Sequence, residues 1–352
     1  MVQFASRSDA RHFLKGRIMT RLVSSLRQGR NSRRRPALSL VLLLLVVTGV
    51  PKLAANQPRD LLRAAKSWGY QLQDIEVGPL RRSNYDILVI DAGAPAPGSE
   101  FSKRALQSMQ RKRDGSRRLV FAYLNIGEAE DYRYYWRRSW KKKPPAWMGR
   151  ENCHWKGDHR VRFWMKDWQN ILIGSSHSYL ARIIDMGFDG VYLDRVDIYR
   201  YWKGERPQSF DDMVAFVRRL SAWAKKRKTG FLIIAQNGEG LLASDSYRAA
   251  IDGQAKEDLI FGNHGNGVRN ADWRYKKARD LILKAKADGL PVFAIEYLRK
   301  NALIEEANRT FKKLGFVPYY GPRSLSRLGV DDKFHPEDGQ SEPLMDEVRG
   351  KC

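Results

Sequence analysis

Apolar runs alternate with helical patterns through residues 56–320, a stretch of about 265 residues. Eight of these runs are short, are rich in aliphatic and aromatic side chains, and predict strands. They are residues 68–72, 85–92, 119–126, 190–194, 231–237, 249–257, 292–298 and 316–320. The sixth run is the least apolar, because only Ile251 and its alanines are apolar within it.

Helical patterns fill the intervals between these strands and stop at glycine. Leu180, Ile183 and Ile184 form one apolar stripe that ends before Gly187, and a later stripe ends before Gly315. Strands that alternate with helices indicate a parallel sheet. Eight strand–helix units favour closure into a (β/α)8 TIM barrel, an α/β fold, over an open doubly wound sheet.

Residues 127–176 interrupt this alternation after the third strand and are too many for an ordinary strand-to-helix loop. The insertion is rich in aromatic residues: Tyr132, Tyr134, Tyr135, Trp136, Trp140, Trp147, Trp155, Phe163, Trp164 and Trp168. Aromatic rings at a cleft mouth stack on sugar rings, whereas rings interleaved with Lys and Arg also suit nucleic-acid bases. The alternative is a small satellite core beneath a long loop, and we expect part of the cluster to form one.

Residues 1–55 differ in composition from the rest of the chain and predict a leader. A basic segment is followed by 14 mostly apolar residues, 37–50, and then by Ala54-Ala55. Because a membrane-spanning helix needs about 20 such residues, the arrangement matches a signal peptide, with an uncleaved anchor as the alternative. Either a signal peptide or an anchor would direct the remaining chain to the far side of a membrane. We therefore expect a secreted or periplasmic protein that contacts the membrane only through an uncleaved leader.

The formal net charge is +25, of which residues 1–55 supply +10 from 11 Lys/Arg against one Asp. A basic surface often marks binding to nucleic acid or anionic membranes. An exported chain rarely meets nucleic acid, so we expect no nucleic-acid partner and interpret the charge as a solvated surface. The spacing of Cys153 and Cys352 does not establish whether they pair. Residues 321–352 are polar and aperiodic, which predicts a loosely held tail.

The segment from Gly187 to Asp197 carries the clearest chemical signal. A glycine turn leads into an apolar strand that ends in Asp194, and Asp197 follows closely. Carboxylates at the carboxyl end of a barrel strand lie where such proteins place their chemistry. Burying a charge there costs several kcal/mol unless the charge is paired or used. We therefore predict a catalytic role for Asp194, whereas Asp197 either contacts substrate or only caps the next helix.

Acidic residues gather at the ends of other predicted strands as well. The set is Asp91, Glu128, Glu130, Asp131, Asp194, Asp197, Glu239, Glu257, Asp258 and Glu296. It predicts one acidic face on a basic body, with Tyr123 and Asn237 in the same layer to orient substrate hydroxyls. Facing carboxylates and an aromatic cleft favour glycoside hydrolysis, with a calcium or magnesium site as the rival. We expect no metal and no cofactor, since the sequence has no Gly-rich phosphate loop and no His-rich cluster.

Several stretches resemble glycoside hydrolase family 114, the endo-α-1,4-polygalactosaminidase-like (β/α)8 barrels. The matching stretches run in order and are residues 85–91, 122–136, 163–168, 187–197, 235–239, 251–258 and 296–298. The resemblance implies Asp194 as nucleophile and Glu257 as acid/base at the ends of the fourth and sixth strands. It also implies retention at an α-linkage, for which the two carboxyl groups lie about 5–5.5 Å apart.

The predicted substrate-binding residues combine the strand-end set with residues of the matching stretches. They are Asp91, Tyr123, Asn125, Glu128, Trp164, Asp197, Asn237, Glu239 and Glu296. We expect an exported glycosidase that acts on an α-linked, amino-sugar-rich polysaccharide and prefers a cationic or neutral chain. The alternatives are a carbohydrate-binding barrel without turnover and a surface-binding protein for nucleic acid or anionic lipid. The sequence leaves the exact sugar, the endo or exo mode and the oligomeric state open.

Overall fold

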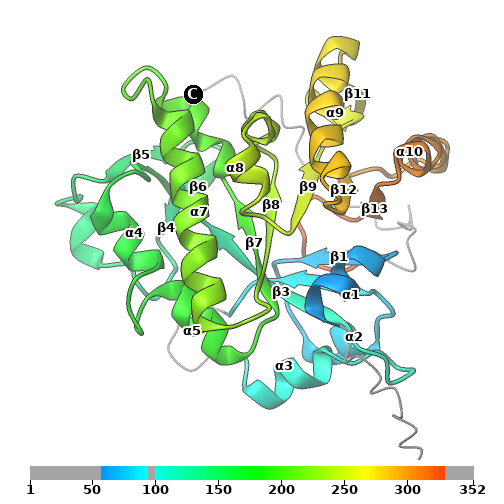
Figure 1. Ribbon diagram of the computed structural model, residues 1–352, viewed down its shortest axis with the longest axis horizontal. Helices are drawn as coiled ribbons and strands as arrows, with labels where there is room; N and C mark the ends of the chain where they lie inside the picture. Colours follow the sequence, from blue (N-terminus) through cyan, green and yellow to red (C-terminus); the bar gives the residue numbers. More distant parts are fainter. Residues whose placement is uncertain (1–56, 94–99, 330–352) are drawn as a thin grey trace, which may run out of the picture. The chain divides into compact units, whose positions relative to one another are not determined.

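The computed structural model describes residues 57–93 and 100–329. Within them, eight parallel strands form an α/β barrel (Figure 1). The strands are β1 (Trp68–Gln71), β2 (Ile87–Ile90), β3 (Leu119–Asn125), β7 (Gly190–Asp194), β8 (Leu232–Gln236), β9 (Gly253–Glu257), β12 (Val292–Glu296) and β13 (Val317–Tyr320). Each lies inside one of the eight predicted runs, so the predicted TIM-barrel fold is confirmed.

The barrel strands follow one another in chain order, β1-β2-β3-β7-β8-β9-β12-β13, and each hydrogen-bonded pair is parallel. Every residue of β2, β3, β8 and β12 is buried. Helices cover the outer face of such strands and side chains fill the barrel inside. Burial on both faces explains why these strands form nearly unbroken apolar runs in the sequence.

The first and last strands are joined by aromatic side chains. Trp68 Nε1 donates to the carbonyl oxygen of Val317 at 3.0 Å, and the Tyr319 hydroxyl donates to that of Tyr70 at 3.2 Å. The ring of Trp68 also stacks on Tyr70 and Tyr192, with centroids 6.0 and 6.1 Å apart. Aromatic rings therefore fill the barrel interior and connect β13 to β1.

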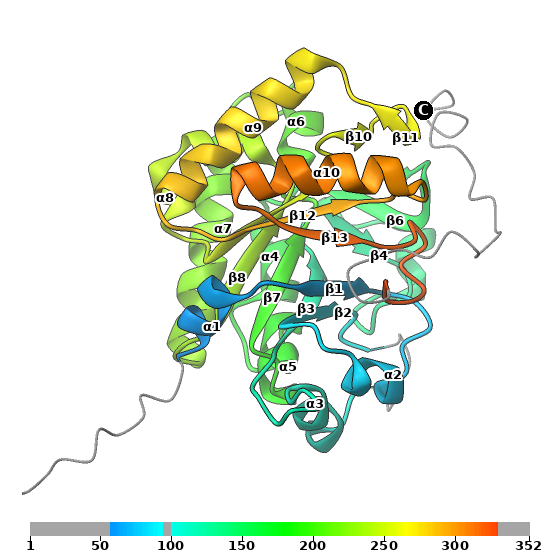
Figure 2. The same ribbon diagram turned by 90° about the vertical axis from the view of Figure 1, so that its right-hand side faces the viewer.

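The helices lie outside the barrel, and Figure 2 shows α10 along β12 and β13. They are α1 (Pro58–Ala64), α2 (Val77–Arg82), α3 (Lys103–Met109), α4 (Lys166–Leu172), α5 (Tyr179–Met186), α6 (Tyr199–Trp202), α7 (Ser209–Arg227), α8 (Asp245–Arg248), α9 (Asp272–Ala287) and α10 (Asn301–Leu314). As predicted, α5 and α10 end at Gly187 and Gly315, whose φ angles of 108° and 65° favour glycine. Short 3-10 turns η1 (Arg138–Lys141), η2 (Val196–Ile198) and η3 (Glu239–Ala243) complete the set.

The segment after β3 forms a small sheet of its own. Strands β4 (Glu128–Glu130), β5 (Met148–Asn152) and β6 (Trp155–Val161) are antiparallel in the order β4-β6-β5. Successive ring contacts with centroids 5.0–5.4 Å apart join four tryptophans, Trp136, Trp140, Trp147 and Trp168. Most aromatic side chains of this segment therefore pack on one another, which is the expected satellite core.

A second antiparallel pair, β10 (Phe261–Gly262) and β11 (Gly265–Arg269), lies between β9 and α9. Residues 321–329, which we expected to belong to a loose tail, lie against the barrel instead. The backbone N–H groups of Leu72 and Gln73 donate to the carbonyl oxygen of Leu325 at 2.9 and 3.0 Å. The Tyr85 hydroxyl donates to the carbonyl oxygen of Gly329 at 2.6 Å. This segment is therefore part of the folded unit.

The predicted leader, residues 1–55, lies outside the described residues, as do residues 330–352 with Cys352. Our expectations for these parts stay predictions. Among residues 57–93 and 100–329, no helix combines the length and apolar character that crossing a bilayer requires.

Candidate active site

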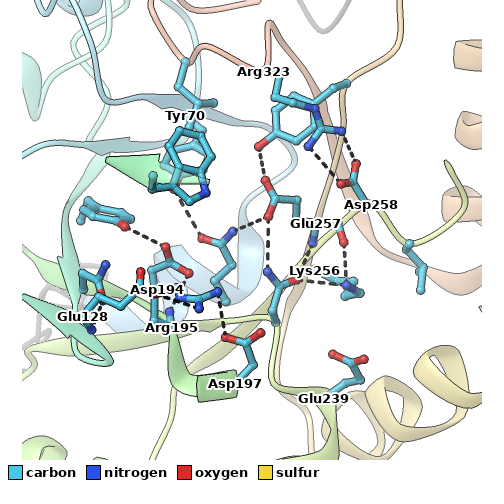
Figure 3. Close-up of a pocket in the computed structure, with 18 of the residues that line it drawn as sticks. Tyr70, Glu128, Asp194, Arg195, Asp197, Glu239, Lys256, Glu257, Asp258 and Arg323 are labelled. Carbon is cyan, nitrogen blue, oxygen red and sulfur yellow. Dashed lines mark hydrogen bonds and ion pairs between the residues drawn. The ribbon is translucent and has the colours of Figure 1, made fainter. Parts of the chain in front are cut away.

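A cavity of about 790 Å³ opens at the carboxyl ends of the barrel strands (Figure 3). Last residues of several strands line it, including Asn125 of β3, Asp194 of β7, Gln236 of β8 and Glu257 of β9. This is the end of a TIM barrel at which active sites are found. The cavity is thus the natural place to look for chemistry.

Asp194 lines this cavity and is held by two donors. The Tyr123 hydroxyl donates to Oδ2 at 2.7 Å, and the backbone N–H of Arg195 donates to Oδ1 at 2.6 Å. Burial raises the pKa of Asp194 to about 7, although the Arg195 charge and the Tyr123 hydrogen bond oppose the shift. The negative charges of Asp197 and Glu257 also raise the pKa of Asp194. Asp194 therefore changes its charge near neutral pH.

Glu257 ends β9 and accepts hydrogen bonds on both of its oxygens. Tyr297 donates its hydroxyl to Oε1, while the side-chain amides of Gln236 and Asn237 donate to Oε2 at 3.1 and 3.4 Å. The hydroxyl of Tyr70 in turn donates to Gln236 Oε1 at 3.4 Å. These neighbours, from β1, β8 and the residues that directly follow β8 and β12, fix the orientation of the Glu257 carboxyl group.

Asp194 and Glu257 face the same cavity from β7 and β9, with β8 between these strands (Figure 3). The charge of Glu257 is one cause of the raised pKa of Asp194, so the two carboxyl groups influence each other. The arrangement therefore presents two carboxyl groups to a molecule bound in the cavity.

Arg195 organises the acids next to Asp194. Its guanidinium donates to Glu128 at 3.0 Å and lies 3.8 Å from Asp197. Glu128 also accepts from Asn152 Nδ2 at 2.9 Å, and Asn125 Oδ1 accepts the backbone N–H of Glu128 at 2.9 Å. Glu128 and Asn125 thus face the cavity while they fix the start of β4.

Asp91 is neutralised by a buried arginine. Arg133 donates to both oxygens of Asp91 at 2.8 and 2.7 Å and to Glu130 Oε2 at 2.6 Å. At the opposite wall, Arg200 lies 3.6 Å from Glu239. The pKa of Glu239 is lowered, because Lys256 and Arg200 outweigh its burial. Much of the predicted acidic face is therefore paired with arginine or lysine.

Nine of the eleven predicted site residues line the cavity, and Trp164 and Glu296 do not. The Glu296 carboxylate accepts the backbone N–H groups of Ile260 and Phe261 at 2.7 and 3.2 Å, so it holds the turn after β9. Trp164 packs against Trp202, with ring centroids 5.5 Å apart. Trp164 is partly buried and Glu296 is fully buried, and contact of these two residues with substrate stays a prediction.

Arg323 is the clearest residue that the sequence analysis missed. It comes from the supposed tail, donates to both oxygens of Asp258 at 2.9 and 3.1 Å, and lies 4.1 Å from the ring centroid of Tyr297. Burial and the charge of Glu257 raise the pKa of Asp258 to about 6, although Arg323 opposes this shift. Nothing in the aperiodic sequence around Arg323 signals this contact.

Asp158 of β6 was also missed. It lines the cavity, and burial, followed by the charges of Glu130, Glu128 and Asp194, raises its pKa to about 8. In the described part of the chain no cation forms an ion pair with it. Among the described residues there is no group of three or more His, Cys, Asp or Glu arranged to hold a metal ion.

Comparisons with known proteins found a family match and several relatives. The sequence profile described as glycoside-hydrolase family GH114 matches residues 50–339. An uncharacterized protein of Methanocaldococcus jannaschii is 29% identical over 345 residues, which covers 86% of this chain and 96% of the relative. An uncharacterized protein of Deinococcus radiodurans is 32% identical over 280 residues, covering 77% and 84%.

A solved structure shares the fold. The glycoside hydrolase domain of PelA from Pseudomonas aeruginosa superposes with a TM-score of 0.58 at 16% identity, covering 76% of this chain and 99% of that domain. At this identity the similarity supports the barrel alone. The family assignment rests on the sequence profile.

Proposed function

Because this chain belongs to glycoside-hydrolase family GH114, we propose that it hydrolyses an α-linked, galactosamine-containing polysaccharide with retention of configuration. The observation that carries this proposal is the pair of carboxyl groups, Asp194 and Glu257, that face one cavity from β7 and β9. A retaining glycosidase needs one carboxylate to attack and one carboxylic acid to donate a proton. Membership of the family supports hydrolysis of a glycosidic bond. Our proposal adds the identity of the sugar, the linkage and the stereochemistry.

In the first step, a carboxylate oxygen of Asp194 attacks the anomeric carbon while the bond from that carbon to the leaving oxygen breaks. Glu257 gives its proton to the leaving oxygen, so that a free hydroxyl departs. In the second step, a water molecule attacks the same carbon and returns its proton to Glu257, which regenerates the Asp194 carboxylate. Two displacements at one carbon leave the anomeric configuration unchanged.

The surroundings of each carboxyl group suit these roles. The Tyr123 hydroxyl and the Arg195 charge favour the ionised form of Asp194, which the attack requires. Tyr297, Gln236 and Asn237 fix the carboxyl group of Glu257, whose position must match the leaving oxygen. The proposed attack requires an ionised Asp194, and proton donation to the leaving oxygen is the part that the proposal gives to Glu257.

The charge of the cavity supports an amino-sugar substrate. Arg133 pairs with Asp91 and Glu130, and Arg195 pairs with Glu128 and Asp197, which leaves Asp158 as the carboxyl group beside the catalytic pair that has no ion pair among the described residues. An ammonium group on the sugar can pair with such a carboxylate inside a cavity where water screens little. A uronate polymer would instead place like charges together.

We also propose that the protein is exported or tethered to the membrane through its leader. The support is the basic segment followed by residues 37–50 and small residues. A polysaccharide outside the cytoplasm is the substrate class that this location would provide.

The test of the proposed function is a hydrolysis panel with the purified protein. Deacetylated galactosamine polymer, its acetylated form and polygalacturonate are incubated with the wild type, Asp194→Asn and Glu257→Gln. Asp185→Asn is the matched control, since Asp185 pairs with Arg227 on the outer surface. We expect cleavage of the galactosamine polymer by the wild type and the control only. Binding of the polymer without cleavage would favour the carbohydrate-binding barrel, and preferred cleavage of the uronate would refute the substrate assignment.

A further inference from the structure

Two tryptophans line the cavity with most of their side chains exposed. Trp155 is 53% exposed and Trp273 is 63% exposed, whereas most aromatic residues of the folded unit are buried. Leaving large apolar rings in water is unfavourable, and such rings at a cavity commonly mark a binding surface. A flat indole next to a carbohydrate site suits the apolar face of a sugar ring.

The two tryptophans come from distant parts of the barrel rim. Trp155 begins β6 in the segment after β3, the third barrel strand, and Trp273 lies in the first turn of α9, which follows β9, the sixth strand. Segments that follow the third and sixth of eight strands lie on nearly opposite sides of the barrel mouth. Asp194 of β7 lies on the arc between β3 and β9, and Glu257 ends β9.

We propose that Trp155 and Trp273 are the stacking platforms of two outer sugar subsites, one on each side of the catalytic pair. This inference rests on the proposed glycosidase function and adds the path of the substrate. A chain that contacts both platforms extends beyond the cleaved bond in both directions. The cavity then binds an internal stretch of the polysaccharide rather than one chain end.

A carboxyl group lies beside one platform, and cations lie beside the other. Asp158 lines the cavity on the same strand as Trp155 and carries no ion pair in the described part of the chain. Beside Trp273, Arg274 and Lys277 of α9 line the cavity, and the Arg274 guanidinium lies 5.2 Å from the Trp273 ring centroid. The Trp155 subsite therefore suits a sugar with an ammonium group. The Trp273 subsite suits a sugar without positive charge, such as an N-acetylated unit.

The platforms are tested with galactosamine chains of increasing length. Trp155→Ala and Trp273→Ala are compared with Tyr201→Ala, since Tyr201 is 48% exposed and lies outside the cavity. We expect each tryptophan variant to raise KM for the polymer on the order of tenfold at similar kcat, and by less than about twofold for the disaccharide. Equal losses at every length, or no loss on the polymer, would overturn the platform assignment.

The role of the two tryptophans can be tested even if the proposed hydrolysis is not observed. If the wild type cleaves none of the chains, the glycosidase proposal fails. Binding of the same chains is then compared by calorimetry between the wild type and the tryptophan variants. Weaker binding of long chains to both variants supports the platforms, and unchanged binding overturns them.

The charge difference is tested on α9. Lys277→Glu places a negative charge in the cavity, and Lys276→Glu is the control, because Lys276 is on the same helix but does not line the cavity. We expect the ratio of kcat/KM for the fully deacetylated polymer to that for the acetylated polymer to rise at least about threefold in Lys277→Glu only. An equal change in both variants, or no change in either, would contradict the assigned charge preference.

Discussion

The hydroxyl of Tyr123 donates a 2.7 Å hydrogen bond to Oδ2 of Asp194, across the ladder that pairs β3 with β7. This bond favours the ionised carboxylate and partly offsets the burial that raises the pKa of Asp194 to about 7. A buried tyrosine on a neighbouring strand thus favours the ionised form of Asp194.

Tyr123→Phe is therefore expected to raise the pKa of Asp194. The acidic limb of the kcat/KM profile should move to higher pH by about half a unit to one unit, because a lost hydrogen bond to a charged group costs about 1 kcal/mol or more. The measurement is the pH dependence of hydrolysis between pH 5 and 9. Tyr192→Phe is the control, since the buried Tyr192 hydroxyl makes no hydrogen bond with any residue that the structure describes. If the acidic limb of the kcat/KM profile shifted equally in both variants, the shift would come from general repacking and not from the lost hydrogen bond.

The pH profile of the wild type distinguishes the two possible roles of Asp194. As nucleophile, Asp194 has to be ionised, so activity should be lost as the pH falls below about 7. As general acid, it would have to be protonated, and activity would be lost as the pH rises above that value. The pH dependence of kcat/KM for the galactosamine polymer decides between these two roles. If activity fell only as the pH rose above about 7, Asp194 would be the general acid and not the nucleophile.

Asp194→Asn should stabilise the fold at alkaline pH. Since the pKa of Asp194 is raised from an ordinary value near 3.8 to about 7, the folded state binds the proton more tightly than the unfolded state between these values. Ionisation of Asp194 therefore lowers stability as the pH rises through this window. We expect a gain of about 1–3 kcal/mol at pH 8 and a smaller one at pH 5, measured by urea unfolding. A loss of stability at pH 8 would indicate that the carboxylate is structural.

Arg323→Gln should lower both stability and activity. The substitution breaks the ion pair in which Arg323 donates two hydrogen bonds to Asp258. It also removes the cation beside the ring of Tyr297, whose hydroxyl donates to Glu257. We expect a loss of about 2–4 kcal/mol in the free energy of unfolding and a clear fall in kcat, with partial recovery in Arg323→Lys. Arg309→Gln, at an exposed position on α10, is the control. Wild-type kcat in Arg323→Gln would show that the 321–329 segment only closes the barrel.

The sequence sufficed for the barrel because its strands are buried on both faces. Runs such as residues 119–126 and 190–194 contain enough apolar residues to be recognised without tertiary information, and glycines mark the helix ends. The grouping of the strand-end carboxylates was also predictable, because a parallel sheet brings the carboxyl ends of its strands to one side. Asp194 and Glu257 belong to this set.

The remaining contacts depend on partners distant in the chain. Arg323 pairs with Asp258, 65 residues earlier, and no local pattern indicates such a contact. Glu296 ends a barrel strand like the cavity acids, yet the turn after β9 places two backbone N–H groups against its carboxylate. Trp273 lies at the start of an ordinary helical pattern, so its exposure beside the cavity follows only from the position of α9.

The most direct measurement of the catalytic assignment is mass spectrometry of Glu257→Gln treated with an α-galactosaminyl fluoride. Fluoride leaves without a proton, so Asp194 can still attack, whereas release of the sugar from the enzyme lacks the base that activates water. The predicted result is a covalent sugar adduct on the peptide that contains Asp194. An adduct on a different residue, or release of inverted product without an adduct, would contradict the assignment of Asp194 as nucleophile.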